Sequence, residues 1–241
     1  MTEKTIERVH SALDDFCIEL PSWGFADTGT RFGKFLQDGA AIDLADKLSD
    51  AGEVHRVTGS CPKVATHVLW DFEEGKTPSD IVALANENGM QLGSINPNLF
   101  QDQEYRLGSL CNVDPAIRET AAQHIRDSIK LGQDVGSDVL TLWLADGTNY
   151  PGQDSIRARK RRLEEALKGF HENLAPEQTF LIEYKPFEPA FYHTDIADWG
   201  MSYLYAQKMG PQAKVLVDTG HHYQAQNIEQ IVAWLLDEEM L

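Results

Sequence analysis

Two short stretches join an apolar run to side chains that could bind a metal ion or transfer a proton. In the first, FLIEYK at residues 180–185, Glu183 and Lys185 lie two residues apart. On an extended strand both side chains point to one face, and Pro186 ends the strand because it has no amide hydrogen to donate. This pattern favours a ligand site, although Glu183 could be a surface acid and Lys185 only its ion-pair partner.

The second stretch, VLVDTGHH, spans residues 215–222. Its β-branched start predicts a strand that delivers Asp218, after which Gly220 turns the chain and presents His221 and His222. Only one of the two histidines can face the centre, and its spacing of three residues from Asp218 favours His221. Asp218 could instead do no more than cap the turn that follows the strand.

Glutamate, aspartate and histidine from these two strand ends would form a ligand shell of oxygen and nitrogen without sulfur. Such a shell suits Mn²⁺, Mg²⁺ or Co²⁺ better than structural zinc. A cation of this kind beside a lysine fits a small polyhydroxylated substrate, because the metal can polarise vicinal oxygens. The two stretches therefore predict one metal-assisted reaction centre.

The elements that position these residues alternate between apolar strands and amphipathic helices about five times. This alternation predicts a parallel sheet. The strand count alone favours an open sheet, since a closed eight-stranded barrel needs about three more units. Strands are expected at 64–70, 91–95 and 138–144 and from 180 and 215; helices are expected at 79–88, 115–135, 155–173, 196–209 and 228–236.

The first sixty residues differ from the rest because they lack this alternation. Helices are expected at 5–16 and 40–51, with a structured loop rich in turn formers and aromatic residues between them. We therefore expect an N-terminal helical extension over residues 1–60 and one catalytic domain over residues 61–241.

Function in such sheets lies at the carboxyl ends of the strands. There the first expected strand presents His67 and Trp70, the second Phe100, and the third Trp143. A histidine on a strand is more often a core residue, and the two tryptophans are by default packing residues. A role as walls of a substrate pocket is the alternative.

Composition excludes several classes of partner. The chain carries 21 Lys and Arg against 38 Asp and Glu, a net charge of -17 that would repel nucleic acid and anionic lipid. Its 3 cysteines are odd in number and widely spaced, which argues against a disulfide framework or a thiolate zinc site. There is neither a membrane-span pattern nor a cleavable signal, so we expect a cytoplasmic protein.

Six stretches in order resemble one family, the L-rhamnose isomerases of the broad-specificity bacterial type, members of the xylose-isomerase-like barrel superfamily. The resemblance runs through nearly the whole chain. It implies a (β/α)8 TIM-barrel type of fold, with about five βα units in this chain. The stretches are GTRFGKF (29–35), THVLWD (66–71), NPNLFQD (96–102), LTLWLADGTNYPGQ (140–153), EYKPFEPAFY (183–192) and VLVDTGHH (215–222).

By matching position, the resemblance implies a role for each candidate residue. Glu183 would bridge two divalent ions, with Asp218 on the structural ion and His221 on the catalytic ion. Mn²⁺ is the first expectation, and Co²⁺, Mg²⁺ or Zn²⁺ are alternatives. Lys185 would lie near the sugar O1 and His67 near the ring oxygen or O5. The pocket walls would be Trp70, Trp143 and Phe100.

The implied reaction is the interconversion of L-rhamnose and L-rhamnulose. Hydrogen would move between C1 and C2, either as a hydride or as a proton through an enediol. Family members are longer and tetrameric, and their later strands supply further ligands, so we expect this chain to be truncated, with weak metal binding and little activity alone. The alternatives are a non-catalytic remnant of such a barrel or a metal-dependent hydrolase or endonuclease of the same superfamily.

Overall fold

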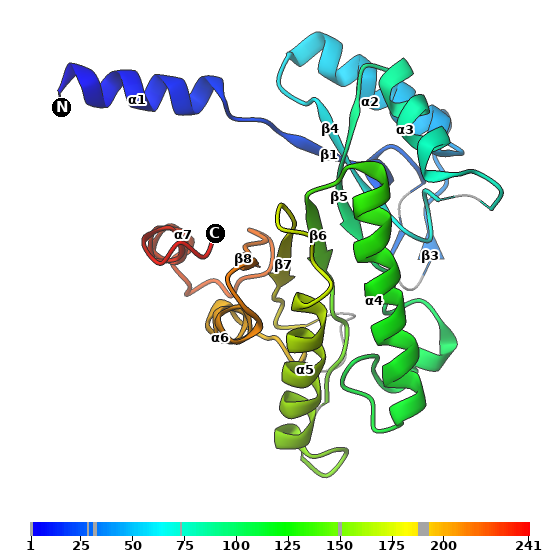
Figure 1. Ribbon diagram of the computed structural model, residues 1–241, viewed down its shortest axis with the longest axis vertical. Helices are drawn as coiled ribbons and strands as arrows, with labels where there is room; N and C mark the ends of the chain where they lie inside the picture. Colours follow the sequence, from blue (N-terminus) through cyan, green and yellow to red (C-terminus); the bar gives the residue numbers. More distant parts are fainter. Residues whose placement is uncertain (1, 28, 31–32, 73, 149–150, 188–192) are drawn as a thin grey trace. The chain divides into compact units, whose positions relative to one another are not determined.

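Six strands form the main sheet of the protein (Figure 1). The computed structural model describes residues 2–27, 29–30, 33–72, 74–148, 151–187 and 193–241. The strands are hydrogen-bonded in the order β1 (Glu19–Pro21), β4 (Lys63–His67), β5 (Gln91–Asn96), β6 (Val139–Leu142), β7 (Thr179–Glu183) and β8 (Ala213–Leu216). The pairings β1–β4, β5–β6, β6–β7 and β7–β8 are all parallel.

Helices connect the successive strands of this sheet, as a parallel arrangement requires. The alternation predicted from the sequence is confirmed, with most boundaries shifted by a few residues. The helices are α1 (Glu3–Asp14), α2 (Leu44–Thr58), α3 (Pro78–Glu87), α4 (Pro115–Val135), α5 (Ile156–His171), α6 (Trp199–Met209) and α7 (Ile228–Asp237).

The helix ends follow from local sequence. Thr77 and Asp80 form a reciprocal capping box at the start of α3, which satisfies two amide groups that have no partner within the helix. At the end of α4, Gly136 adopts the left-handed conformation with φ of 75°, which glycine reaches without steric cost. These local signals explain why α3 and α4 were predicted almost to the residue.

One strand of the main sheet, β1, was missed by the sequence analysis. β1 is only three residues long and ends in Pro21, so it lacks the long apolar run by which the other strands were recognised. The expected loop after it contains a short 3-10 helix (η1, Ser22–Gly24) and a two-stranded antiparallel sheet, β2 (Gly29–Thr30) and β3 (Gly33–Lys34). Parts of three motif stretches, at 31–32, 149–150 and 188–192, lie outside the described residues.

The chain divides into two compact units, and β5 contributes to both. The first consists of residues 1–66 and 70–93, and the second of residues 67–69 and 94–241. The division expected from the sequence, an extension up to residue 60 and a barrel domain after it, stays a prediction.

In the first unit, a buried ion pair ties α2 to the turn after β4. The Lys47 ammonium lies 2.6 Å from the Asp71 carboxylate and also donates to the carbonyl of Trp70. Asp71 accepts a further hydrogen bond from the Ser22 hydroxyl, at 2.5 Å. By contrast, α1 in the same unit has no buried residue, although Ile6, Val9 and Leu13 recur at helical spacing.

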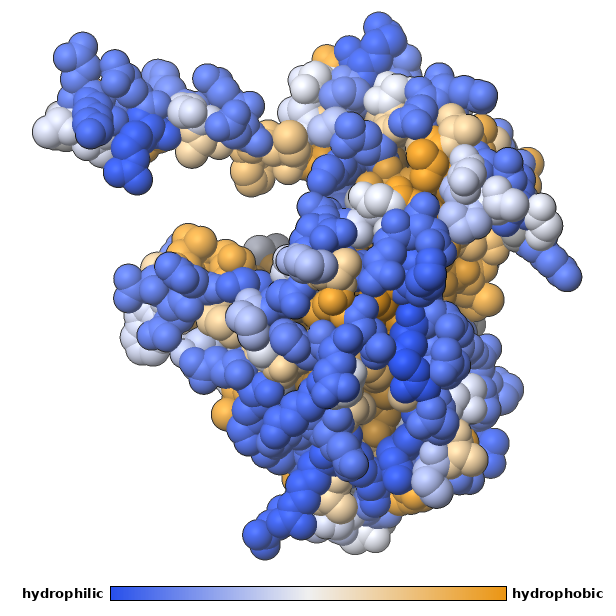
Figure 2. All heavy atoms as spheres, in the orientation of Figure 1, coloured by the Kyte–Doolittle hydropathy of each residue, from blue (hydrophilic) through white to orange (hydrophobic). Residues whose placement is uncertain are grey.

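The second unit has one apolar core between its strands and helices α4, α5, α6 and α7. Phe170 of α5 stacks on Phe180 of β7 with ring centroids 6.2 Å apart. The outer surfaces of α4 and α5 in this view are mostly hydrophilic (Figure 2), as expected for helices that cover one face of a sheet. None of the helices in the described parts of the chain is both long and apolar enough to cross a bilayer.

Candidate functional site

Two neighbouring strands of the second unit bring three potential metal ligands together. Glu183 is the last residue of β7, and Asp218 and His221 follow the end of β8, which pairs with β7 in parallel. The Nδ1 atom of His221 lies 3.2 Å from Glu183 Oε1 and 3.4 Å from Asp218 Oδ2. One ligand atom from each residue lies within 4.8 Å of the other two.

The turn after β8 determines which histidine reaches the group. Gly220 donates to Asp218 Oδ1 at 2.7 Å, and the His221 amide donates to the Asp218 carbonyl at 3.1 Å. These bonds close a tight turn, so the side chain three residues after Asp218 returns to it. The spacing argument for His221 over His222 agrees with this geometry.

The electrostatics of the group favour a protonated imidazole in the absence of metal. The neighbouring Glu183 carboxylate raises the pKa of His221 above its ordinary value, partial burial opposes this shift, and Asp218 adds to it. The Lys185 cation acts in the opposite direction. A divalent cation would replace that proton between the same three groups.

The donor groups fit such a cation. His221 Nδ1 is shielded from solvent, and it makes no hydrogen bond of good geometry with any described residue. Glu183 is only 8% exposed, and a buried carboxylate is costly unless a positive charge compensates it. Two carboxylates and one imidazole are the oxygen and nitrogen ligands that Mn²⁺, Mg²⁺, Co²⁺ or catalytic zinc accept.

Lys185 lies two residues after Glu183, beyond the end of β7, and is half-buried. Its backbone is held at both ends: its amide donates to the carbonyl of Ile196 at 3.0 Å, and its carbonyl accepts from the Thr194 hydroxyl. The position of Lys185 therefore depends on the segment before α6 as well as on β7.

A second group of predicted site residues surrounds His67, the last residue of β4. The imidazole is fully buried, and its ring centroid lies 5.9 Å from those of Phe100 and Trp143. Its Nδ1 atom accepts a hydrogen bond from the Leu69 amide at 3.3 Å. This bond places the proton of the neutral ring on Nε2, so that Nε2 can act as a donor.

Trp70, the third aromatic residue predicted as a pocket wall, belongs to the first unit. Its ring packs edge-on against Trp23, with centroids 6.0 Å apart and planes at 68°. Its carbonyl accepts from the buried Lys47 ammonium at 3.2 Å. Its predicted role as a pocket wall stays a prediction.

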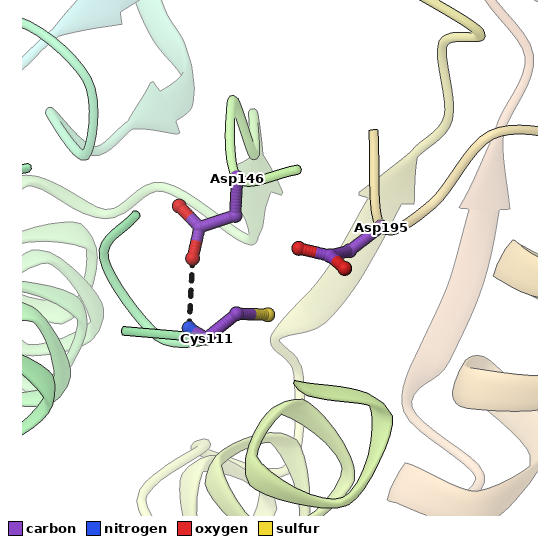
Figure 3. A group of neighbouring side chains, drawn as sticks. All are labelled: Cys111, Asp146 and Asp195. Carbon is purple, nitrogen blue, oxygen red and sulfur yellow. Dashed lines mark hydrogen bonds between the residues drawn. The ribbon is translucent and has the colours of Figure 1, made fainter. Parts of the chain in front are cut away.

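The structure also assembles a group that the sequence analysis did not find: Cys111, Asp146 and Asp195 (Figure 3). These residues follow β5, β6 and β7 respectively, and their potential ligand atoms also lie within 4.8 Å of one another. The only sequence signal was the acidic residue that follows the apolar run of β6. Cys111 and Asp195 lie in irregular segments whose contacts cannot be deduced from spacing.

In this Cys111 group one carboxylate is ion-paired and the other is hydrogen-bonded. Asp146 accepts from the Ser109 amide, the Ser109 hydroxyl and the Cys111 amide, each at 2.7 Å. Asp195 forms a bidentate ion pair with Arg159, at 3.0 Å from Nε and 2.7 Å from Nη2. Burial raises the pKa of the Cys111 thiol, so it stays protonated. A cation here would have to displace a buried guanidinium, and we interpret the group as structural.

Comparison with solved structures shows the same fold in several sugar epimerases. The D-allulose 3-epimerase from Methylomonas sp. superposes with a TM-score of 0.66 and 14% identity, covering 92% of this chain and 70% of that one. A D-psicose 3-epimerase from Clostridium cellulolyticum gives 0.65 and 14%, covering 90% and 68%. At these identities the similarity concerns the fold alone.

Two curated proteins are more similar in sequence. A “Probable sugar isomerase” of Mesorhizobium japonicum is 34% identical over 241 residues, and one of Rhizobium meliloti is 36% identical over 244 residues. Each alignment covers 98% of this chain but only 55% and 56% of the respective relatives, so the chain spans about half their length. Residues 61–239 match the family described as the xylose isomerase-like TIM barrel. The chain therefore belongs to the xylose isomerase-like TIM-barrel family.

Proposed function

We propose that the protein is a divalent-metal-dependent aldose–ketose isomerase that interconverts L-rhamnose and L-rhamnulose. The observation that carries this proposal is the convergence of Glu183, Asp218 and His221 at the carboxyl ends of two adjacent parallel strands. The names of the two curated relatives support the sugar isomerase class. The preference for L-rhamnose rests on the six motif stretches.

In this proposal Glu183, Asp218 and His221 hold the metal, with Mn²⁺ as the first expectation. A bound divalent ion would polarise adjacent oxygens of the sugar. The three side chains offer fewer ligands than the six or more oxygen and nitrogen atoms that such ions take, which leaves positions for substrate oxygens and other ligands. Glu183 has two carboxylate oxygens and could bridge a second ion.

The remaining residues would orient the sugar. Lys185 would donate to the oxygen on C1 and balance negative charge that develops there. The Nε2 hydrogen of His67 would donate to a ring or hydroxyl oxygen, and the rings of Phe100 and Trp143 that flank it would cover C–H surface. Because these three rings come from the end of β4 and from the segments after β5 and β6, they would hold the sugar by shape as well as by hydrogen bonds.

The test is conversion of L-rhamnose in the presence of Mn²⁺, followed by NMR detection of the ketose. Since the chain spans about half of its curated relatives, we would assay it alone and mixed with the unmatched part of the Mesorhizobium relative. We expect ketose in the mixture and its loss with Glu183→Gln. A protein that binds Mn²⁺ through Glu183 but converts only another sugar would contradict the substrate. A C3 epimer as the product would contradict the reaction class.

A further inference from the structure

The pleat of β7 points consecutive side chains to opposite faces of the sheet, and so creates a second pairing behind the candidate metal site. Glu183 lies beside His221 on one face. On the other face the Tyr184 hydroxyl forms a 2.7 Å hydrogen bond with Nε2 of His222. The two rings meet edge to face, with centroids 5.4 Å apart and planes at 81°. His221 and His222, which follow β8, thus contact the last residue of β7 and the residue after it.

Tyr184 offers a rigid attachment point. It is 1% exposed and belongs to the apolar core between the sheet and its helices. Its ring cannot move without disturbing close-packed neighbours, so its hydroxyl is fixed relative to β7.

The segment that bears Asp218 and His221 has few other attachments. Thr219 and Gly220 are exposed, as are residues 223–225. Within the described residues, the side chains of 218–222 reach another strand segment through two contacts, one from His221 to Glu183 and one from His222 to Tyr184. The first joins the candidate ligands themselves, so of these two contacts only the second can fix the segment independently of a metal. Immediately after the segment, the Tyr223 ring packs edge-on against Phe187, with centroids 6.2 Å apart.

We propose that Tyr184 and His222 are positioning residues, whose hydrogen bond holds Asp218 and His221 in place for a cation. This inference rests on the proposed function, because it assigns a support to the same site. Neither residue belongs to the candidate ligand group, and each would act through its neighbour in the chain. Partners that orient metal ligands typically change affinity 10–100-fold when removed.

The experiment is titration of the protein with Mn²⁺, monitored by calorimetry and by the electron paramagnetic resonance of free and bound ion. Tyr184→Phe removes only the hydroxyl, and His222→Ala removes the imidazole. We expect both variants to weaken binding by about 10-fold or more. His222→Gln should recover most of the affinity, since its side-chain amide nitrogen can occupy the place of Nε2.

Tyr105→Phe is a matched control. Tyr105 is also buried, and its hydroxyl forms a 3.0 Å hydrogen bond with His124 Nδ1 away from the site. Its loss should leave Mn²⁺ affinity unchanged. Equal losses in Tyr105→Phe and Tyr184→Phe would show a general effect on stability and overturn the inference, as would an unchanged affinity in Tyr184→Phe.

A metal-free measurement separates this inference from the proposed function. In the NMR spectrum of the protein without metal, Tyr184→Phe should shift or broaden the His221 imidazole signals, and Tyr105→Phe should not. Unperturbed His221 signals would contradict the positioning role whatever the metal data show. Absence of Glu183-dependent Mn²⁺ binding in the wild type would instead contradict the proposed function.

Discussion

Two groups of three potential metal ligands lie at the carboxyl ends of the strands in the second unit, and they differ in what surrounds them. In the Cys111 group, Arg159 neutralises Asp195, and amide and hydroxyl groups donate hydrogen bonds to both carboxylate oxygens of Asp146. In the Glu183 group, the shielded Nδ1 of His221 lies close to two carboxylates without a hydrogen bond among the described residues. In both groups the potential ligand atoms lie close together. The Glu183 group differs because its hydrogen bonding is incomplete among the described residues.

This difference predicts opposite effects of substitution. A saturated network contributes to the stability of the fold, so its residues should matter for unfolding and little for metal binding. A group with unmet charge and hydrogen-bonding needs contributes less to the fold and is free to bind a ligand.

Substitution of Arg159 should cause the largest loss of stability. Arg159→Met leaves Asp195 as a buried carboxylate without its partner, and breaking such a pair costs about 3–5 kcal/mol. The measurement is urea unfolding monitored by circular dichroism. Arg157→Met, an exposed position on the same helix, is the control and should change the free energy of unfolding by less than about 0.5 kcal/mol. Equal, small effects of both changes would mean that the network is not structural.

Substitution of Glu183 should act mainly on metal binding. Glu183→Gln keeps the shape but removes the charge, and because loss of an indirect partner already costs 10–100-fold, we expect a direct ligand to cost at least about 100-fold in Mn²⁺ affinity. Calorimetric titration measures this change, with the exposed Glu165→Gln as the control. If Glu183→Gln lowered the free energy of unfolding by more than it lowered the free energy of Mn²⁺ binding, Glu183 would be a structural residue like Asp195.

The pH dependence should also separate the two groups. The pKa of His221 is raised above 6.5 by Glu183, so the stabilising contact is fully present below the unfolded pKa and is lost as the pH rises through the folded pKa. Metal binding needs the neutral imidazole, so Mn²⁺ affinity should rise over that same range. Mn²⁺ titrations of the wild type and of His221→Asn between pH 6 and 9 measure this change, and the affinity of the variant should not rise over that range. A pH-independent difference would mean that His221 does not bind the metal.

The smallest effect is expected from Cys111. Cys111→Ala should leave Mn²⁺ affinity within about twofold and cost about 1 kcal/mol of stability, the order expected for a small buried cavity. Burial and a raised pKa should also protect this thiol from iodoacetamide in the folded protein, whereas exposed Cys17 should react. Mass spectrometry of the alkylated protein measures both sites. Strong loss of metal binding in Cys111→Ala would reverse the roles of the two groups.

Sequence reasoning was most successful where local pattern decides structure. The alternating apolar runs predicted the strands β4 to β8, and the spacing of Asp218 and His221 matched the turn that brings them together. It failed for β1, whose three residues carry too little pattern. That the Glu183 group binds metal stays a prediction.

Contacts made by irregular segments, such as the one that bears Asp195, could not be predicted from one sequence. Arg159 and Asp195 are separated by 36 positions, and nothing in either segment indicates that they meet. The adjacent pairs at 183–184 and 221–222 did carry a signal, because strand alternation sends neighbouring residues to opposite faces. The double histidine was noted, but its second member has a partner only when Tyr184 is placed as well.

The alternation along β7 also restricts how this strand can change in length. One residue inserted before Glu183 would rotate the acid toward the helices and the tyrosine toward the opposite face, and one deleted residue would do the same. Both the ligand group and its support would then be lost together. Two residues would restore the facing but would move the tip by roughly 6–7 Å along the strand, out of reach of the turn after β8. A change in the length of this strand should therefore affect the ligand group and its support at once, whereas a single substitution changes only one of them.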